Sequence, residues 1–262
     1  MRIALLSDIH GNTLALEAVL ADIEERGGVD TYWILGDFSS LGYDPVGVLE
    51  RITRLPNVFF LQGNHDRYIV IGERPGLTRA WSLVESKPHL APILQAMATN
   101  LTWTQERIHE SGWWDWFTRL PMELRVTLPD GTRVLGVHVA PGVEDGAGII
   151  PLLTDDELHT MVASAEADVV IVGHTHVPLD RTVGSVRVFN LGSISNPMLS
   201  RLNASYAILE ANESGHDLQL CYVEYDRMAV IEALKRVNHP TVDFLAGFIH
   251  GKVTPIWAKQ PS

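Results

Sequence analysis

Two histidines separated by one residue, His174 and His176, are the side chains with the clearest chemical potential in this sequence. They follow the β-branched run of residues 168–172, which predicts a short buried strand ending at the pair. Side chains at positions i and i+2 of an extended chain point the same way, so both rings can face one point. Neutral imidazole is the commonest metal ligand, but two rings bind a cation weakly unless oxygen ligands join them. The pair therefore predicts a metal site that needs carboxylates from elsewhere.

Carboxylate, amide and imidazole side chains do occur at the ends of other expected strands. The candidates, each at or just beyond such an end, are Asp8, His10, Asp37, Asn64, His138, His174 and His176. Taken singly, an aspartate after a strand is more often a helix cap, a lone histidine is more often hydrogen-bonded or solvated, and an asparagine can be a turn residue. Together these explanations would need a separate coincidence at each strand end, so a shared metal centre is the better interpretation.

The elements that must position these residues alternate in the first half of the chain. Apolar segments at 3–7, 31–35 and 57–62 predict strands, and amphipathic helices are expected from residue 14 and over about 44–55. Such repeated units predict a parallel sheet with helical crossovers, whose ligands bind at the carboxyl ends of the strands. The polar loops that carry the candidate ligands fall there.

Residues 67–120 break this rhythm and predict a helical insertion, which contains five of the seven tryptophans. They are Trp81, Trp103, Trp113, Trp114 and Trp116. We expect these indoles to pack onto the main core; the alternative is that some line a substrate pocket or a dimer contact.

Strands return in the second half, where the segments 122–128 and 132–139 predict a hairpin. The other expected elements are helices over about 154–165 and 227–237, hairpins around 184–185 and 212–215, and a loosely assigned tail from 239 to 262. Antiparallel strands beside the parallel units predict a mixed α/β architecture.

Composition limits the class of protein. Hydrophobic residues make up 46% and charged residues 20% of the 262-residue chain, as in a folded soluble domain. The net charge of -12 argues against a nucleic-acid duplex or an anionic membrane as the main partner. No apolar run approaches a membrane span, and the N-terminus resembles a first strand rather than a signal peptide. Cys221 alone cannot form a disulfide within the chain, and a cytoplasmic location is the expectation.

The candidate residues resemble, in order, the five signature blocks of the calcineurin-like metallophosphoesterases. The blocks are Asp8-Ile9-His10, Gly36-Asp37 with Gly42, Gly63-Asn64-His65-Asp66, His138, and Gly173-His174-Thr175-His176. The resemblance spans residue 3 to about residue 200 and is strongest to the small bacterial and archaeal phosphoesterases. It implies a four-layer sandwich of two mixed β-sheets flanked by helices, formed by one domain over residues 1–262 with the insertion at about 67–120.

The resemblance also implies two divalent metal ions. By the family pattern, one ion is held by Asp8, His10 and His176, the other by Asn64, His138 and His174, and both by Asp37. Such ligands suit Mn²⁺, Fe, Zn²⁺, Co²⁺ or Ni²⁺, and geometry and availability choose among them; Mn²⁺ is the ion we expect. Two such ions, less two carboxylates and a hydroxide, leave a charge of about +1 that attracts a phosphate anion.

The implied activity is hydrolysis of a phosphodiester or phosphomonoester of a small soluble substrate by a metal-bridging hydroxide. His65 matches the histidine that protonates the leaving group, and we expect Asp66 to orient its ring. Asn12 is a candidate phosphate contact or a helix cap. The alternative function is a non-catalytic metal-binding scaffold acting through protein contacts; the retention of every ligand and of His65 favours the enzyme. The sequence leaves a homo-oligomer open.

Departures from the family pattern bear on the substrate. Leu41 and Gln62 stand where Ser/Thr protein phosphatases carry arginines, and Leu41 also where symmetrical dinucleoside tetraphosphatases carry one. Because those arginines grip phosphate bidentately, their absence counts against both activities. Arg67 and Arg201 either supply a compensating charge or lie on the surface.

Overall fold

The first strands carry alternate residues into two different cores. In the computed structural model, which describes residues 1–75, 90–198 and 200–252, β1 spans Arg2–Leu6. Its Ile3 and Leu5 side chains pack into a core between two sheets, whereas Ala4 and Leu6 pack against helices on the outer side. This alternation follows from the two-residue period of a strand and explains why so short a segment is almost wholly apolar.

The first sheet has the strand order β10-β9-β1-β2-β3. β2 (Thr31–Leu35) and β3 (Val58–Leu61) run parallel to β1, while β9 (Ala204–Asn212) and β10 (Gly215–Val223) form an antiparallel hairpin on its other side. The expected parallel units and the expected C-terminal hairpin therefore share one sheet.

The second sheet has the order β4-β5-β6-β8-β7 and is also mixed. Its strands are β4 (Glu123–Thr127), β5 (Arg133–Val137), β6 (Val169–Val172), β7 (Leu179–Val183) and β8 (Val186–Asn190). β5, β6 and β8 are parallel, and the two edge strands are antiparallel to their neighbours.

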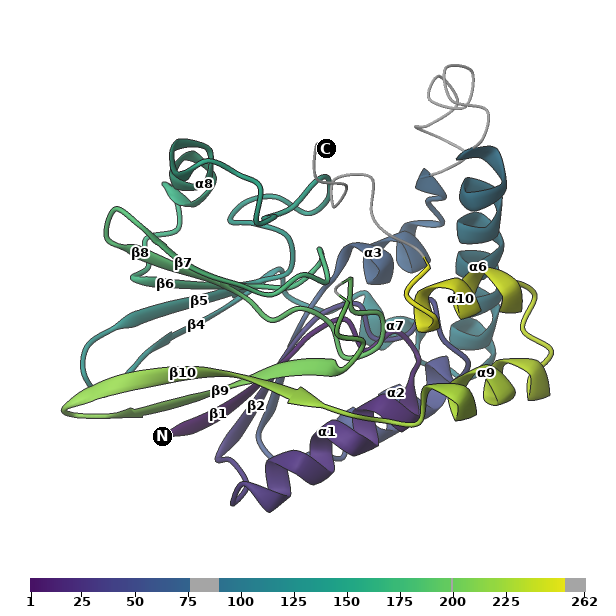
Figure 1. Ribbon diagram of the computed structural model, residues 1–262, viewed down its shortest axis with the longest axis horizontal. Helices are drawn as coiled ribbons and strands as arrows, with labels where there is room; N and C mark the ends of the chain where they lie inside the picture. The colour runs from purple at the N-terminus through teal and green to yellow at the C-terminus, as the bar shows by residue number, and fades with distance from the viewer. Residues whose placement is uncertain (76–89, 199, 253–262) are drawn as a thin grey trace.

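Helices cover the outer face of each sheet (Figure 1). α1 (Thr13–Glu25) and α2 (Pro45–Ile52) pack on the first sheet, and α8 (Asp155–Val162) packs on the second. α2 ends at Ile52 rather than near residue 55, because Pro56 restricts the residue before it. The predicted four-layer sandwich of two mixed sheets is confirmed.

The other helices of the described residues lie together at one end of the sandwich (Figure 1). They are α3 (Asn64–Ile71), α6 (Ala91–Glu110), α7 (Trp114–Phe117), α9 (Arg227–Arg236) and α10 (Val242–Ile249). The described part of residues 67–120 is thus helical, and α10 gives the loosely assigned tail a defined element. Within the described ranges, no helix has the length and apolar character that crossing a bilayer requires.

The tryptophans of this region serve mainly the core. Trp113, Trp114 and Trp116 are partly buried against the cluster between the first sheet and its helices, which confirms the packing interpretation for these three. Trp103 packs against the ring of His239, which follows α9, with ring centroids 4.3 Å apart. Trp81 lies outside the described residues.

The loop after β1 and the loop after β2 are in direct main-chain contact. The main-chain N–H groups of His10 and Gly11 donate to the carbonyl oxygens of Asp37 and Phe38, at 3.0 and 2.8 Å. A Cβ atom added to Gly42 would lie 1.9 Å from the carbonyl oxygen of His10. Two polar loops are therefore locked at a separation that only a glycine allows.

We expect Gly42→Ala to lower the free energy of unfolding by about 3 kcal/mol or more, because main chain must move to accommodate the methyl group. Gly112→Ala is the control: nothing lies within 4 Å of its added Cβ, and only the positive φ of 80° opposes the change. That strain should cost about 1 kcal/mol. Urea unfolding measures both values, and equal losses would contradict the close packing of the loops.

Candidate metal centre

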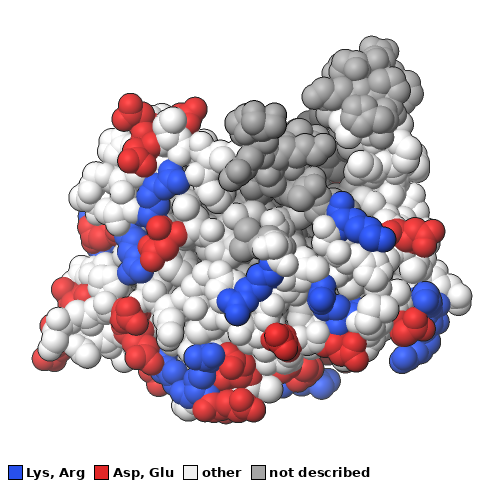
Figure 2. Space-filling view, viewed as in Figure 1, with Lys and Arg blue, Asp and Glu red and all other residues white. Residues whose placement is uncertain are grey.

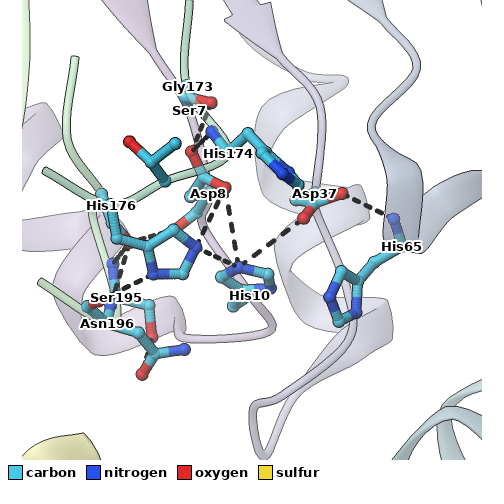
Figure 3. A network of polar contacts seen from close by, with 12 residues as sticks. Ser7, Asp8, His10, Asp37, His65, Gly173, His174, His176, Ser195 and Asn196 are labelled. Carbon is cyan, nitrogen blue, oxygen red and sulfur yellow. Dashed lines mark hydrogen bonds and ion pairs between the residues drawn. The ribbon is translucent and has the colours of Figure 1, made fainter. Parts of the chain in front are cut away.

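The seven predicted ligands lie together at the carboxyl ends of β1, β2, β3, β5 and β6. A first group contains Asp8, His10 and His176, which point toward one another in Figure 3. The Asp8 Oδ1 atom lies 3.2 Å from His176 Nε2 and 3.7 Å from His10 Nε2. The two Nε2 atoms are 3.1 Å apart. All three side chains are buried, so water competes little for these atoms.

A second group lies beside the first. The Oδ1 atom of Asn64 is 3.0 Å from His138 Nε2 and 2.9 Å from His174 Nδ1. Asp37 stands between the groups, with Oδ2 3.4 Å from His138 Nε2 and 3.8 Å from His10 Nε2. A carboxylate in this position can act as a ligand in both groups.

Backbone strain is concentrated at these ligands. Asp8, His10, Asp37, His174 and His176 all have positive φ values, between 48° and 68°. The left-handed conformation costs a non-glycine residue about 1–2 kcal/mol, so the surrounding contacts must hold it. These turns lie at the strand ends, where the side chains point into the cluster.

Backbone carbonyl groups fix the tautomer of each ring. Three rings donate from Nδ1: His10 to Ser40 O (3.1 Å), His138 to Leu35 O (2.6 Å) and His176 to Asn196 O (2.7 Å). His174 is reversed, since its Nε2 donates to the Gly146 carbonyl at 2.9 Å. A carbonyl oxygen only accepts, so a ring in its neutral form has its lone pair on the opposite nitrogen. In all four rings this opposite nitrogen faces the cluster.

The charges of the cluster call for a cation. Burial favours the neutral form of Asp8, but the nearby His176 ring outweighs it and holds the Asp8 pKa at about 2. Burial likewise opposes protonation of His138, yet the carboxylates of Asp37 and Asp8 raise its pKa to about 10. Burial lowers the pKa of His10 to about 3, although Asp37 opposes this. Burial also opposes protonation of His176, but the Asp8 carboxylate raises the pKa of this ring. Two buried carboxylates thus draw positive charge into the site.

One atom tests directly whether a metal fits. Asp8 Oδ1 is buried and has no hydrogen-bond partner among the described residues. Its other oxygen, Oδ2, accepts from Ser7 Oγ at 2.7 Å and from the His174 main-chain N–H at 3.0 Å. An unpartnered carboxylate oxygen among inward-facing imidazole lone pairs is a set of donors suited to a divalent cation. The residues therefore fit the metal that the resemblance implies.

Ser40 is a contact that the sequence interpretation missed. His65 lies at the edge of the cluster, its ring centroid 5.4 Å from that of His10, and burial lowers its pKa. The Oγ atom of Ser40 is 2.8 Å from His65 Nδ1, and the His65 main-chain N–H donates to Asp37 Oδ1 at 2.9 Å. Ser40 lies in the loop after β2, and its position relative to His65 depends on how two loops meet.

The expectation that Asp66 orients the His65 ring is wrong. Both carboxylate oxygens of Asp66 accept main-chain N–H groups instead, from Asp37 at 2.7 Å, Phe38 at 3.1 Å and Gly63 at 2.9 Å. The carboxylate is fully buried and ties the loop after β2 to the loop after β3. Asp66 therefore shapes the site through the backbone of Asp37.

Three other candidates have structural partners. Asn12 caps α1, because its Oδ1 accepts from the Ala15 N–H at 3.1 Å, which confirms the capping interpretation. Arg67 is held by carboxylates, with Glu73 at 3.0 Å and Asp145 at 3.2 Å, so its charge is compensated. Arg201 lies over the ring of Tyr222 at the surface.

A cavity of about 270 Å³ opens onto the cluster. Its polar wall includes Asp37, Asn64, His65, His174 and His176. The cavity thus gives a small molecule access to both groups of candidate ligands and to the ring of His65.

We expect Asp66→Asn to lower the free energy of unfolding of the metal-free protein by about 2–3 kcal/mol, since an amide offers one acceptor atom to three buried N–H donors. Asp44→Asn is the matched control. Asp44 caps α2 with one bond of 2.9 Å to the Gly47 N–H, and asparagine caps a helix about as well. Urea unfolding compares the variants, and a neutral effect of Asp66→Asn would contradict its role as a loop tie.

Comparison with known proteins places this geometry in a family. Residues 1–214 match the calcineurin-like phosphoesterase superfamily domain. An uncharacterised protein of Methanocaldococcus jannaschii is 28% identical over 254 residues, covering 91% of this chain and 93% of its own. The symmetrical bis(5'-nucleosyl)-tetraphosphatase of Sodalis glossinidius is 31% identical over 93 residues, only 35% of this chain and 31% of its own.

Solved structures show the same fold. A metallophosphoesterase from Sphaerobacter thermophilus, 25% identical, superposes with a TM-score of 0.71 over 94% of this chain and 98% of its own. A hypothetical protein from Pyrococcus horikoshii, 23% identical, gives a TM-score of 0.76 over 93% and 97%. The ordered ligand blocks, the sandwich and the match over residues 1–214 lead to one conclusion: the chain belongs to the calcineurin-like phosphoesterase superfamily.

Proposed function

We propose that this protein is a metal-dependent phosphoesterase that hydrolyses a phosphodiester or phosphomonoester of a small substrate. The observation that carries the proposal is the convergence of three imidazole Nε2 atoms, those of His10, His138 and His176, within 4.0 Å of Asp8 Oδ1. This buried oxygen has no hydrogen-bond partner among the described residues and lies beside His65, at an open cavity. A structural cluster would satisfy its buried polar atoms internally. Membership of the phosphoesterase superfamily supports the same activity.

We assign Asp8, His10 and His176 to one divalent cation, and Asn64, His138 and His174 to a second. Asp37 is assigned to both, because its Oδ2 lies between His10 and His138. When bound, such ions polarise phosphoryl oxygens and lower the pKa of bound water. Mn²⁺ is the ion we expect, with Fe, Zn²⁺, Co²⁺ and Ni²⁺ as alternatives for the same ligands.

His65 is proposed to protonate the leaving oxygen of the ester. It lines the cavity, and Ser40 occupies its Nδ1, so Nε2 is the nitrogen left to face a substrate. A proton on Nε2 would pass to the leaving oxygen as the phosphorus–oxygen bond breaks, which releases an alcohol rather than an alkoxide. Ser40 is a positioning residue, which holds the ring without a charge of its own.

The surface supports a small substrate. On the face drawn in Figure 2, basic side chains lie scattered among acidic ones rather than gathered into a patch. With a net charge of -12, the chain offers little of the positive field that a nucleic-acid duplex requires. The attraction for phosphate is therefore proposed to come from the metal centre itself.

We expect His65→Ala to lower kcat by about 10²–10⁴-fold, the range for loss of a general acid, with the bound metal content unchanged. His109→Ala is the control, because His109 is exposed on α6 and stacks on Trp114 with ring centroids 3.7 Å apart. Steady-state kinetics and elemental analysis measure both variants. Unchanged turnover in His65→Ala would remove this residue from the mechanism, and a metallated protein without turnover would favour a scaffold.

Elemental analysis of the purified protein should find two divalent ions per chain, as the ligand assignment predicts. Asp37→Asn should lower this content, because the shared ligand loses its charge, whereas Asp156→Asn on the exposed face of α8 should not. Full metal loading of Asp37→Asn would contradict the shared site.

A chelator should abolish hydrolysis of chromogenic phosphate esters, and added Mn²⁺ should restore it. Monoesters and diesters are compared as matched pairs, and the ester that is hydrolysed faster identifies the substrate class.

A further inference from the structure

We propose that the substrate carries an uncharged, apolar leaving group, which binds in a subsite formed by Leu41, Met97 and Phe248. The proposal rests on the phosphoesterase function proposed above and adds the class of ester. It follows from the second wall of the cavity, which the chemistry of phosphate-ester cleavage does not use.

This wall is apolar. Besides the candidate ligands, the cavity is lined by Leu41, Met97, Ala147, Met198 and Phe248. Among the described residues that line the cavity, none is a lysine or an arginine. An ester bound by its phosphoryl group at the ligand cluster would therefore place its remaining atoms against hydrocarbon, which favours an apolar group by removing its surface from water.

The three subsite residues come from three distant parts of the chain. Leu41 follows β2, Met97 belongs to α6 and Phe248 belongs to α10, beyond the residues 1–214 that match the family. Leu41 shares a hydrophobic cluster with α9 and α10, and Met97 and Phe248 pack against that cluster. The C-terminal helices thus form one continuous apolar layer that reaches the candidate metal centre.

Leu41 is held in place by a dedicated contact. Its φ is 63°, a strained value for leucine, and its main-chain N–H donates to Asn100 Oδ1 at 2.8 Å. Asn100 is fully buried, and its Nδ2 lies 3.1 Å from Nε2 of buried His239. A buried polar chain from the C-terminal segment therefore fixes the leucine that lines the cavity.

Charge argues against a polyphosphate substrate. A chain of several phosphates needs several cationic partners, and the described wall offers none beyond the candidate metal ligands. Arg67 lies near the Gly146 loop, but it forms ion pairs with Glu73 and Asp145. A single phosphoryl group with an apolar remainder matches the cavity, whereas a nucleoside polyphosphate does not.

The test measures binding, so it does not depend on turnover. Phenylphosphonate and methylphosphonate present the same phosphonate group with and without a ring. Calorimetry on the Mn²⁺-loaded protein should show phenylphosphonate binding about tenfold more tightly, because the ring is buried. 4-Carboxyphenylphosphonate, which adds a charge to the ring, should bind more weakly than phenylphosphonate.

Variants assign the preference to this wall. Phe248→Ala and Met97→Ala should reduce the phenyl preference several-fold and leave the affinity for methylphosphonate unchanged. Phe244→Ala is the matched control: Phe244 lies on the same helix, with its ring centroid 5.2 Å from that of Phe248, but does not line the cavity. Thermal unfolding and metal content confirm that each variant is folded and loaded.

The outcomes separate this proposal from the proposed function. Equal affinity for the two phosphonates, absence of phosphonate binding, or a preference lost in Phe244→Ala but kept in Phe248→Ala would overturn the subsite. A phenyl preference located at Phe248 in a protein that hydrolyses no ester would support the subsite and reject the enzyme. Ester hydrolysis without the phenyl preference would support the enzyme and overturn the subsite.

Discussion

The burial of two carboxylates, those of Asp8 and Asp37, is the constraint on which the rest of this structure depends. Removing a charge from water costs several kcal/mol even after a protein relaxes, so each carboxylate needs donors or positive charge around it. No single segment supplies these partners. Imidazoles arrive from both sheets, and main-chain N–H groups of His65 and His174 supply further donors. The meeting of five strand ends is what makes one shared centre of charge possible.

The same centre explains where the chain is strained. Left-handed backbone at five candidate ligand positions costs about 1–2 kcal/mol each. The loops that carry these residues pack so closely at glycines such as Gly42 that the strained residues have no room to relax. Asp66 ties these loops by accepting three buried N–H groups. Rigid loops hold the oxygen and nitrogen atoms that face the cluster close together, so the chain itself sets the geometry of the centre. The same rigid loops therefore cause both the backbone strain at the candidate ligands and the fixed geometry of the centre.

The sequence predicts the convergence of the candidate ligands better than it predicts the residues that support them, for a physical reason. A ligand such as Asp37 or His174 lies at the end of a strand, and strand ends follow from local apolar runs. The four-layer sandwich was predictable from the same runs together with the family resemblance. Ser40 and Asp66 act through contacts between loops far apart in the chain, for which local periodicity gives no signal. The misassigned partner of Asp66 is an error of this kind.

The chain divides the tasks of cleavage and selection between different elements. Strand ends within residues 1–214 carry every candidate ligand, and their geometry leaves little freedom to change. α10 lies outside that segment, contributes no candidate ligand and reaches the cavity through Phe248 and the cluster around Leu41. Half-buried side chains on such a helix can change without disturbing a buried charge. A fixed centre beside an exchangeable apolar wall lets one fold accept different esters, because Met97 and Phe248 bear no charge and can change without disturbing a candidate ligand. Leu41 differs from them, because its strained backbone is held by Asn100.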